Sequence, residues 1–331
     1  MLISLKTTLL LVLLGASLTA VESTQAIEKG KAVPVAVKRT SSLSKQKIPA
    51  TGGSARNAEP SREMRKLAVQ SGSALVVNQD GGDVLYQKNA EVVAPIASIT
   101  KLMTAMVVLD SVPDLQAPIT ISEDDIDTLR GSHSRLHVGA VMTRETALLL
   151  ALMSSENRAA NALARHYPGG MPAFLAAMNI KAQALGMSDT RFEDPTGLTS
   201  NNLSTANDLA KMVAAAHRYP LIRELSTMPE AIVEISGRQM AYHNTNPLVK
   251  SAAWDVGLSK TGYISEAGKC LVMQARVADK TVVIVLLDSA GKLTRVGDAN
   301  RIKRWMESVH ASSRSSVHAV AGPQGALATP G

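Results

Sequence analysis

The sequence contains very little cysteine and few aromatic residues. One of its 331 residues is cysteine, so a secreted chain of this sequence would have no internal disulfide. This residue, Cys270, lies in the strand-like run 270–273, where we expect a small buried apolar side chain rather than a nucleophile. Aromatic residues make up 3% of the chain, and outside residues 27–66 the charge is balanced. Both features argue against a nucleic-acid partner.

The sequence also lacks an apolar run long enough to cross a bilayer. The apolar residues 9–14 form a run that is far too short to span. A positive residue, Lys6, precedes this run and small residues follow it, an order that is typical of a secretory signal. We therefore interpret residues 1–26 as a signal peptide, cleaved after Ala20 or Ala26, with an uncleaved anchor as the alternative.

Positive charge is concentrated in one segment. Residues 27–66 contain ten lysines and arginines against three acidic residues, so their net charge of +7 equals that of the whole chain. Proline, serine and glycine are frequent there, which predicts a disordered linker. This linker is either a solvated tether or a weak contact to the wall or membrane. We expect one folded domain over 67–310 and a disordered tail over 311–331.

The hydrophobic pattern changes twice along the folded part. Strand-forming segments occur at 73–86 and again at 232–287, with hairpin-type turns between them. Residues 110–220 have mostly helical patterns, and a last helix is predicted at 293–309. This order predicts an α/β fold of the α+β type, in which one antiparallel sheet is flanked by helices and carries a mostly helical insertion.

Ser98 and Lys101 begin an apolar run that follows Pro95 and extends to Leu109. The run predicts a helix buried on most sides, with both polar groups on one face of its first turn. A buried lysine is costly unless it is paired or performs chemistry. Burial and nearby positive charge lower the lysine pKa, and the neutral amine can then take the serine proton. We therefore expect a nucleophile and a base here.

The S-x-x-K spacing is a weak signal by itself. The same spacing begins at Ser42, Ser44 and Ser289, and the first two of these lie in the predicted linker. Ser98 differs from them because it lies at the head of a predicted buried helix. The positive field of a helix N-terminus would also favour the oxyanion that forms after nucleophilic attack.

Ser155 and Asn157 lie at a predicted break between two helices. A hydroxyl there can pass a proton to a leaving amine, and an amide can donate to a substrate carbonyl. The alternative is ordinary N-capping of the second helix, which would be preferred if the pair stood alone. Ser200 and Asn202 have the same spacing but lie in a predicted loop.

Lys260, Thr261 and Gly262 lie on a predicted strand. A lysine next to a threonine suits a carboxylate, which accepts from both the ammonium and the hydroxyl. Gly262 would let a substrate backbone approach closely. The alternative is an exposed lysine on an edge strand. His133 and His137 are spaced like metal ligands, but the surrounding sequence favours loop histidines, and we expect no metal ion.

The three motifs S-x-x-K, S-x-N and K-T-G occur here in that order, on a helix, a loop and a strand. Together they resemble the motifs of low-molecular-mass penicillin-binding proteins of the D-alanyl-D-alanine peptidase family. Residues 96–110, 150–160 and 166–170 look like the endopeptidases of that family. The resemblance covers roughly residues 70–310 and implies a penicillin-binding protein/β-lactamase-like transpeptidase fold.

The resemblance implies a role for each residue. Ser98 would attack the carbonyl and carry the acyl group, with Lys101 as base. Ser155 would pass the proton to the leaving amine, and Asn157 would position the peptide. The substrate carboxylate would lie against Lys260 and Thr261, beside Gly262 and Tyr263. The backbone N–H groups of Ser98 and Tyr263 would form the oxyanion hole.

The implied activity is periplasmic hydrolysis of the D-Ala–diaminopimelate cross-links of peptidoglycan, with β-lactams as inhibitors and no cofactor. One carboxylate clamp serves D-Ala release equally, so a D-alanyl-D-alanine carboxypeptidase is the nearest alternative. A non-catalytic β-lactam-binding or wall adaptor protein and a secreted β-lactamase are further alternatives. We find no E-x-x-x-N element of the β-lactamase type; residues 193–197 occupy that region. Slow β-lactam hydrolysis is therefore expected.

Overall fold

The computed structural model describes residues 67–320, which lie in one compact unit. The predicted signal peptide and basic linker, and residues 321–331 of the predicted tail, lie outside the described residues. Among the helices that are described, none combines the length and the apolar character needed to cross a membrane.

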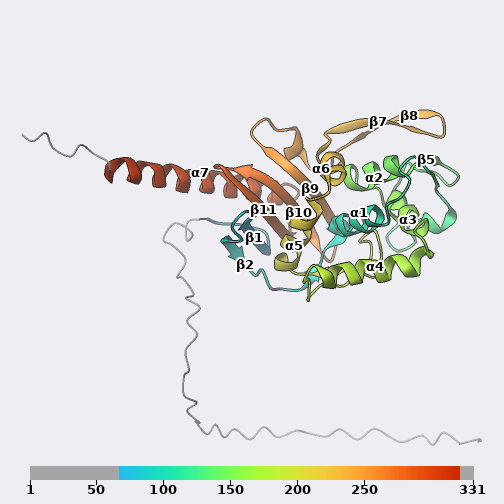
Figure 1. The fold of residues 1–331 in the computed structure, drawn as a ribbon, viewed down its shortest axis with the longest axis horizontal. Helices are drawn as coiled ribbons and strands as arrows, with labels where there is room; N and C mark the ends of the chain where they lie inside the picture. Colours follow the sequence, from blue (N-terminus) through green and yellow to red (C-terminus); the bar gives the residue numbers. More distant parts are fainter. Residues whose placement is uncertain (1–66, 321–331) are drawn as a thin grey trace, which may run out of the picture. The chain divides into compact units, whose positions relative to one another are not determined.

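Within residues 67–320, the largest sheet has five antiparallel strands (Figure 1). In spatial order they are β2 (Val84–Lys88), β1 (Ser73–Asn78), β11 (Lys280–Ser289), β10 (Gly268–Val277) and β9 (Asp255–Ile264). The N-terminal hairpin therefore pairs with the C-terminal meander, through β1 and β11. This pairing confirms the α/β prediction of one sheet built from both ends of the domain. Strand β9 lies at the edge of this sheet.

The two faces of the sheet pack against different helices. Ile284 and Leu286 belong to a core cluster with Ala299 and Ile302 of the C-terminal helix α7 (Thr294–Val320). The alternate residues Val283 and Val285 belong to the larger cluster, which includes the helical block. Because successive side chains of a strand point to opposite faces, both faces of the central strands are apolar and buried.

The segments between β2 and β9 are mostly helical, as predicted, and lie beside the sheet in Figure 1. The α-helices there are α1 (Lys101–Asp110), α2 (Arg144–Met153), α3 (Asn157–Arg165), α4 (Gly170–Ala184), α5 (Ala206–Ala216) and α6 (Pro220–Thr227). Short 3-10 turns are η2 (Ala97–Thr100), η3 (Glu123–Asp125) and η4 (Pro247–Lys250). Two-residue and three-residue strands pair as β3 (Ala94–Pro95) with β6 (Leu203–Ser204) and β4 (Pro118–Thr120) with β5 (Val141–Thr143). The hairpin β7 (Glu230–Ile235) and β8 (Arg238–His243) is separate from the main sheet.

Several element boundaries differ from the sequence prediction. Helix α6 was not predicted, although Pro220 at its first position is a recognised start signal. Helix α5 is capped by Thr205, whose side chain accepts from the backbone N–H of Asp208. Helix α7 continues to Val320 instead of ending near 309, so the tail predicted from 311 begins as helix. No glycine or proline, the usual stop signals, occurs in that stretch before residue 322.

Candidate active site

Ser98 lies in the turn η2, one turn before helix α1 begins at Lys101. The Lys101 ammonium Nζ lies 2.8 Å from Ser98 Oγ and is fully buried. Its other partners are Asn157 Oδ1 and the backbone carbonyl of Thr196, each at 2.7 Å. The predicted pair is therefore in contact, although Ser98 precedes the α-helix instead of lying in its first turn.

Burial lowers the pKa of Lys101 to about 7, against the opposing effect of the Asp194 and Glu156 carboxylates, which favour the charged form. Within residues 67–320 the amine contacts a hydroxyl, an amide and a backbone carbonyl, and no carboxylate of this part of the chain touches it directly. Near neutral pH a substantial share of Lys101 is a neutral amine. Such an amine can accept the proton of the Ser98 hydroxyl.

Ser155 and Asn157 lie at the junction of α2 and α3, as predicted. Ser155 has a φ of +62°, a left-handed conformation that is rare for a residue other than glycine. Its hydroxyl accepts from Lys260 Nζ at 2.8 Å. The junction therefore joins the two lysines, because Asn157 contacts Lys101 while Ser155 contacts Lys260.

Lys260 is also buried, in strand β9. Burial and the positive charges of Lys101 and Arg295 hold its pKa well below the usual range. The nearby positive charge that the sequence prediction assigned to the first lysine is therefore found to act on Lys260. Next along the strand, Thr261 donates its hydroxyl to Thr245 at 2.7 Å. Tyr263 is 59% exposed at the end of β9.

Two glycines let neighbouring segments approach the backbone of Ser98. A Cβ at Gly262 would lie 3.1 Å from Ser98 N and 2.9 Å from the carbonyl oxygen of Ile96. Strand β9 therefore packs closely against η2 at Gly262, a contact that the sequence did not indicate, and the approach of a substrate backbone there stays a prediction. Gly197, at a φ of +81°, is tighter still, since a Cβ would lie 1.9 Å from the carbonyl oxygen of Ala97.

The loop 193–202 supplies parts of the site that the sequence prediction missed. Asp194 accepts from the backbone N–H groups of Thr196 and Gly197, each at 2.5 Å, and this fixes the turn that presents the Thr196 carbonyl to Lys101. Asn202 is fully buried and donates to Thr100 at 3.0 Å. The turn-forming order Asp-Pro-Thr-Gly was a local signal, but the nearness of the loop to α1 was not readable from the sequence.

Ser132 is a second contact that the sequence prediction missed. Its hydroxyl accepts from Asn157 Nδ2 at 2.9 Å, while Asp127 accepts from the Ser132 backbone N–H at 2.8 Å. Hydrogen bonds from this loop, foremost that of the Ser132 side chain, outweigh burial and lower the pKa of Asp127. Asp127, Ser132 and Asn157 thus form a chain that points the amide oxygen of Asn157 toward Lys101.

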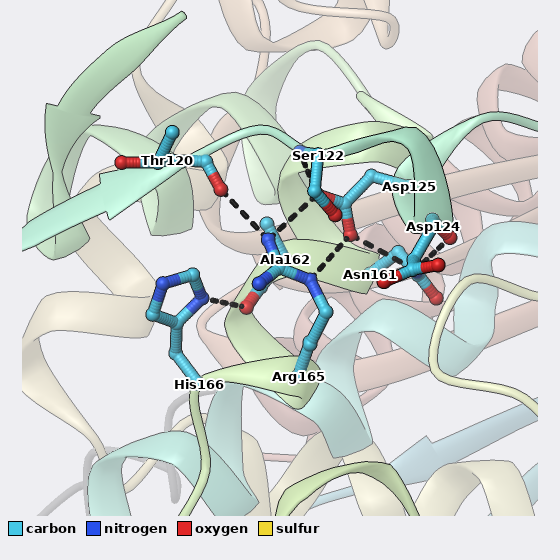
Figure 2. A network of polar contacts seen from close by, with 8 residues as sticks. All are labelled: Thr120, Ser122, Asp124, Asp125, Asn161, Ala162, Arg165 and His166. Carbon is cyan, nitrogen blue, oxygen red and sulfur yellow. Dashed lines mark hydrogen bonds and ion pairs between the residues drawn. The ribbon is translucent and has the colours of Figure 1, made fainter. Parts of the chain in front are cut away.

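The other end of helix α3 is held by a network around Asp125, shown in Figure 2. This carboxylate is 3% exposed and accepts from Arg165 at 2.9 Å, from Asn161 at 3.0 Å and from the Ser122 backbone at 2.8 Å. Arg165 also donates to the Thr120 carbonyl at 2.7 Å. The network fixes α3, and with it Asn157, against η3 and β4.

Comparison with known proteins agrees with this geometry. The sequence profile described as D-alanyl-D-alanine carboxypeptidase matches residues 58–291, which is more than half of the chain. The chain belongs to the D-alanyl-D-alanine carboxypeptidase family. It is 50% identical over 239 residues to a D-alanyl-D-alanine endopeptidase of Pseudomonas aeruginosa, covering 72% of this chain and 77% of the relative. It is 46% identical over 241 residues to the D-alanyl-D-alanine endopeptidase of Escherichia coli, covering 72% and 78%.

Solved structures agree with the family assignment. The Streptomyces K15 DD-transpeptidase matches with a TM-score of 0.68 and 30% identity, covering 73% of this chain and 98% of that one. A D-alanyl-D-alanine carboxypeptidase of Mycobacterium tuberculosis matches with a TM-score of 0.65 and 28% identity. The implied penicillin-binding protein fold is confirmed, and so is the assignment as an enzyme, a peptidase of this D-alanyl-D-alanine carboxypeptidase family.

Proposed function

We propose that the chain is a serine D,D-endopeptidase that hydrolyses D-Ala–diaminopimelate cross-links of peptidoglycan through an acyl-enzyme on Ser98. The observation that carries the proposal is the buried Lys101 amine, with a pKa of about 7, at 2.8 Å from the Ser98 hydroxyl. A neutral amine in contact with a hydroxyl is the requirement for activating a serine without histidine. The two endopeptidases at 50% and 46% identity support this choice of bond.

In acylation, Ser98 Oγ attacks the carbonyl carbon of D-Ala and its proton passes to Lys101. The tetrahedral oxyanion accepts from the backbone N–H groups of Ser98 and Tyr263. Collapse breaks the C–N bond. Ser155 gives its proton to the leaving amine and takes one from its donor Lys260, and the proton held by Lys101 returns to this pair, so both lysines regain their starting states. Water then attacks the ester, and one of its protons passes to Lys101 and from there to Ser98 Oγ as the ester C–O bond breaks. Asn157 holds Lys101 on one side and positions the peptide on the other.

The carboxylate beside the scissile bond binds at Lys260 and Thr261. Arrival of an anion would raise the pKa of Lys260, which burial and two cations lower in the free protein. Substrate binding and protonation of Lys260 are therefore coupled. A penicillin also presents a carboxylate next to its reactive amide and would occupy the same place, which supports β-lactams as inhibitors.

D-Alanyl-D-alanine carboxypeptidase activity is a second candidate. The family profile carries that description, and a Bacillus subtilis relative at 32% identity is named a D-alanyl-D-alanine carboxypeptidase. A terminal D-Ala and a cross-linked diaminopimelate both place a carboxylate beside the bond that is cut. The contacts of Lys260 and Thr261 therefore serve both reactions equally.

The test is chromatography of muropeptides after incubation with the wild-type protein and with Ser98→Ala. We expect the wild type to convert cross-linked dimers to monomers near neutral pH, and Ser98→Ala to leave them intact. Release of D-Ala from monomeric pentapeptide with intact dimers would favour the carboxypeptidase. Labelling by penicillin without cleavage of either peptide would favour a non-catalytic adaptor, and fast nitrocefin turnover would favour a β-lactamase.

The same proposal includes location and domain layout. In a periplasmic enzyme, residues 1–26 would be removed as a signal peptide during export. Residues 27–66 would be either a solvated tether of the catalytic domain or a weak contact to the wall or membrane. Absence of the mature protein from a periplasmic extract of its host would contradict the location. Residues 193–197 occupy the region where class A β-lactamases have the glutamate loop that supports deacylation. We therefore expect the penicilloyl adduct to be long-lived.

A further inference from the structure

A basic cavity of about 540 Å³ lies beside the end of strand β9. The residues that line it come from the segment before β9, from β9 and β10, and from the start of α7: Thr245, Pro247, Tyr263, Lys269, Lys292, Leu293, Arg295 and Val296. Three of these are cations, and none of this lining set is acidic. The cavity therefore has an excess of positive charge, although the folded part of the chain is close to neutral.

The cavity adjoins the predicted carboxylate clamp, because two residues of its lining contact β9 beside Lys260. Thr245 lines the cavity, and its side chain accepts a hydrogen bond of 2.7 Å from the hydroxyl of Thr261. Arg295, also in the wall, donates to the carbonyl of Gly262 at 3.0 Å, and its charge lowers the pKa of Lys260. Tyr263 follows these residues on the strand. A ligand whose carboxylate lies at Thr261 would thus have the cavity as its next neighbour.

The side chains of the cavity are accessible and suited to a polyanionic peptide. Lys269 Nζ lies 4.1 Å from the centre of the Tyr263 ring, its partner across β10 and β9, and the ring is largely exposed. Leu293 is 68% exposed, and Lys292 beside it is exposed as well. Cations next to apolar surface can bind a carboxylate while covering the aliphatic part of the same chain.

We infer that this cavity binds the leaving stem peptide of the cross-link through its carboxylates, an inference that rests on the proposed D,D-endopeptidase activity. The residue that leaves is held at Thr261, so the rest of its peptide continues into the cavity. In carboxypeptidase cleavage the leaving group is D-Ala, which has one carboxylate, already held by the clamp. In cross-link cleavage the leaving stem carries further carboxylates, and Lys269, Lys292 and Arg295 lie where these would bind.

The experiment compares Lys269→Met/Lys292→Met with wild type in cleavage of a cross-linked dimer, in D-Ala release from the monomeric pentapeptide and in penicillin acylation. Each exposed ion pair contributes modestly, and two are removed, so we expect kcat/KM for the dimer to fall roughly tenfold more than the other two rates. Raising the salt concentration should slow dimer cleavage by wild type more than by the double variant. Lys280→Met, which removes one lysine charge at the start of β11, outside the cavity lining, is the control and should change no rate.

Equal losses in all three reactions would overturn the inference, because the lysines would then act on the shared clamp or on the fold. An unchanged rate of dimer cleavage in the double variant would overturn it as well. If wild type itself left dimers intact but released D-Ala, the proposed endopeptidase would have failed and the inference with it. The wild-type measurement therefore separates that case from a failure of the cavity alone.

Discussion

The two ends of helix α3 each contact a buried charged residue of another element, Asp125 of η3 and Lys101 of α1, and these two residues have opposite surroundings. At its C-terminal end Asp125 is neutralised by Arg165 and accepts further hydrogen bonds from Asn161 and a backbone N–H. At its N-terminal end Asn157 contacts Lys101, which is fully buried and touches neutral oxygens. The Asp125 carboxylate is therefore paired with an opposite charge, whereas the Lys101 amine has no opposite charge in direct contact.

The difference separates a structural charge from a chemical one. A buried ion with a partner and full hydrogen bonding keeps its charge, and its main effect is to fix the elements that it joins. A buried amine without a carboxylate in contact lowers its pKa instead, here to about 7 for Lys101. Helix α3 therefore contacts a rigid anchor, Asp125, at one end and a proton acceptor, Lys101, at the other.

The largest expected effect is on chemistry at the N-terminal end. Lys101→Ala removes both the base and the group that activates Ser98, so we expect acylation by fluorescent penicillin to slow by at least about 10³-fold. The free energy of unfolding should change by less than about 2 kcal/mol, because a costly buried amine is removed together with its hydrogen bonds. Stopped-flow acylation and urea unfolding measure the two quantities. Acylation at the wild-type rate would contradict the role of Lys101.

The mirror experiment is Asp125→Ala at the C-terminal end. Breaking a buried ion pair by removing one partner leaves Arg165 uncompensated and should lower the free energy of unfolding by about 3 kcal/mol. Urea unfolding measures this loss. At a temperature where the variant stays folded, acylation should be affected far less than in Lys101→Ala. A loss of acylation without a loss of stability would reverse the contrast between the two ends.

The pH dependence of acylation sharpens the contrast. The pKa of Lys101 is lowered to about 7, and protonation removes the base, so the rate should fall about tenfold per pH unit below that value and level off above it. Glu156 favours the charged amine, so Glu156→Gln should move this limb to lower pH. Asp124→Asn, which removes a carboxylate of the turn η3 that does not act on the Lys101 amine, is the control. If the acid side of the pH–rate profile stayed at the same pH in Glu156→Gln, the effect of the Glu156 carboxylate on the Lys101 pKa would be contradicted.

The smallest expected effect concerns the contact that orients Asn157. Ser132→Ala removes the acceptor of Asn157 Nδ2, and the loss of one hydrogen bond of about 1 kcal/mol should slow acylation roughly fivefold. Because this contact acts through Asn157 and Lys101, the acid limb of the pH profile should also shift. Ser111→Ala, whose hydroxyl bonds its own helix, should change neither quantity. Equal slowing in both variants would mean that Ser132 has no specific role.

Much of the fold was predictable because it follows from local patterns. The hairpin of β1 and β2, the helices on either side of the Ser155 break and the meander of β9 to β11 each have a periodicity and turn residues that set their type. The three motifs were also local, so the sequence singled out Ser98, Lys101, Ser155, Asn157 and Lys260, which the structure brings into contact as Lys101 with Ser98 and Asn157, and Lys260 with Ser155. The start of α1 was placed too early because a 3-10 turn and the first helical turn have similar residue patterns.

Other parts of the site depend on contacts between distant segments. Thr196 and Gly197 touch Lys101 and Ala97 from about a hundred residues away, and Ser132 reaches Asn157 from a loop without a motif. Every residue has a backbone carbonyl, so the residue type at position 196 does not show that its carbonyl accepts from a lysine. The close packing of Gly262 against the turn η2 was likewise not readable from the sequence, which gave only the expectation that a substrate backbone passes there.

The sequence by itself determined the chemistry that is available: a serine and a lysine at helical spacing, a second serine with an asparagine, and a lysine with a threonine on a strand. Only the tertiary structure decided their state, because the pKa of Lys101 depends on how much water the fold excludes and on how near Asp194 and Glu156 lie. Residue types are local, whereas desolvation and electrostatic energy are sums over everything that surrounds a group in space.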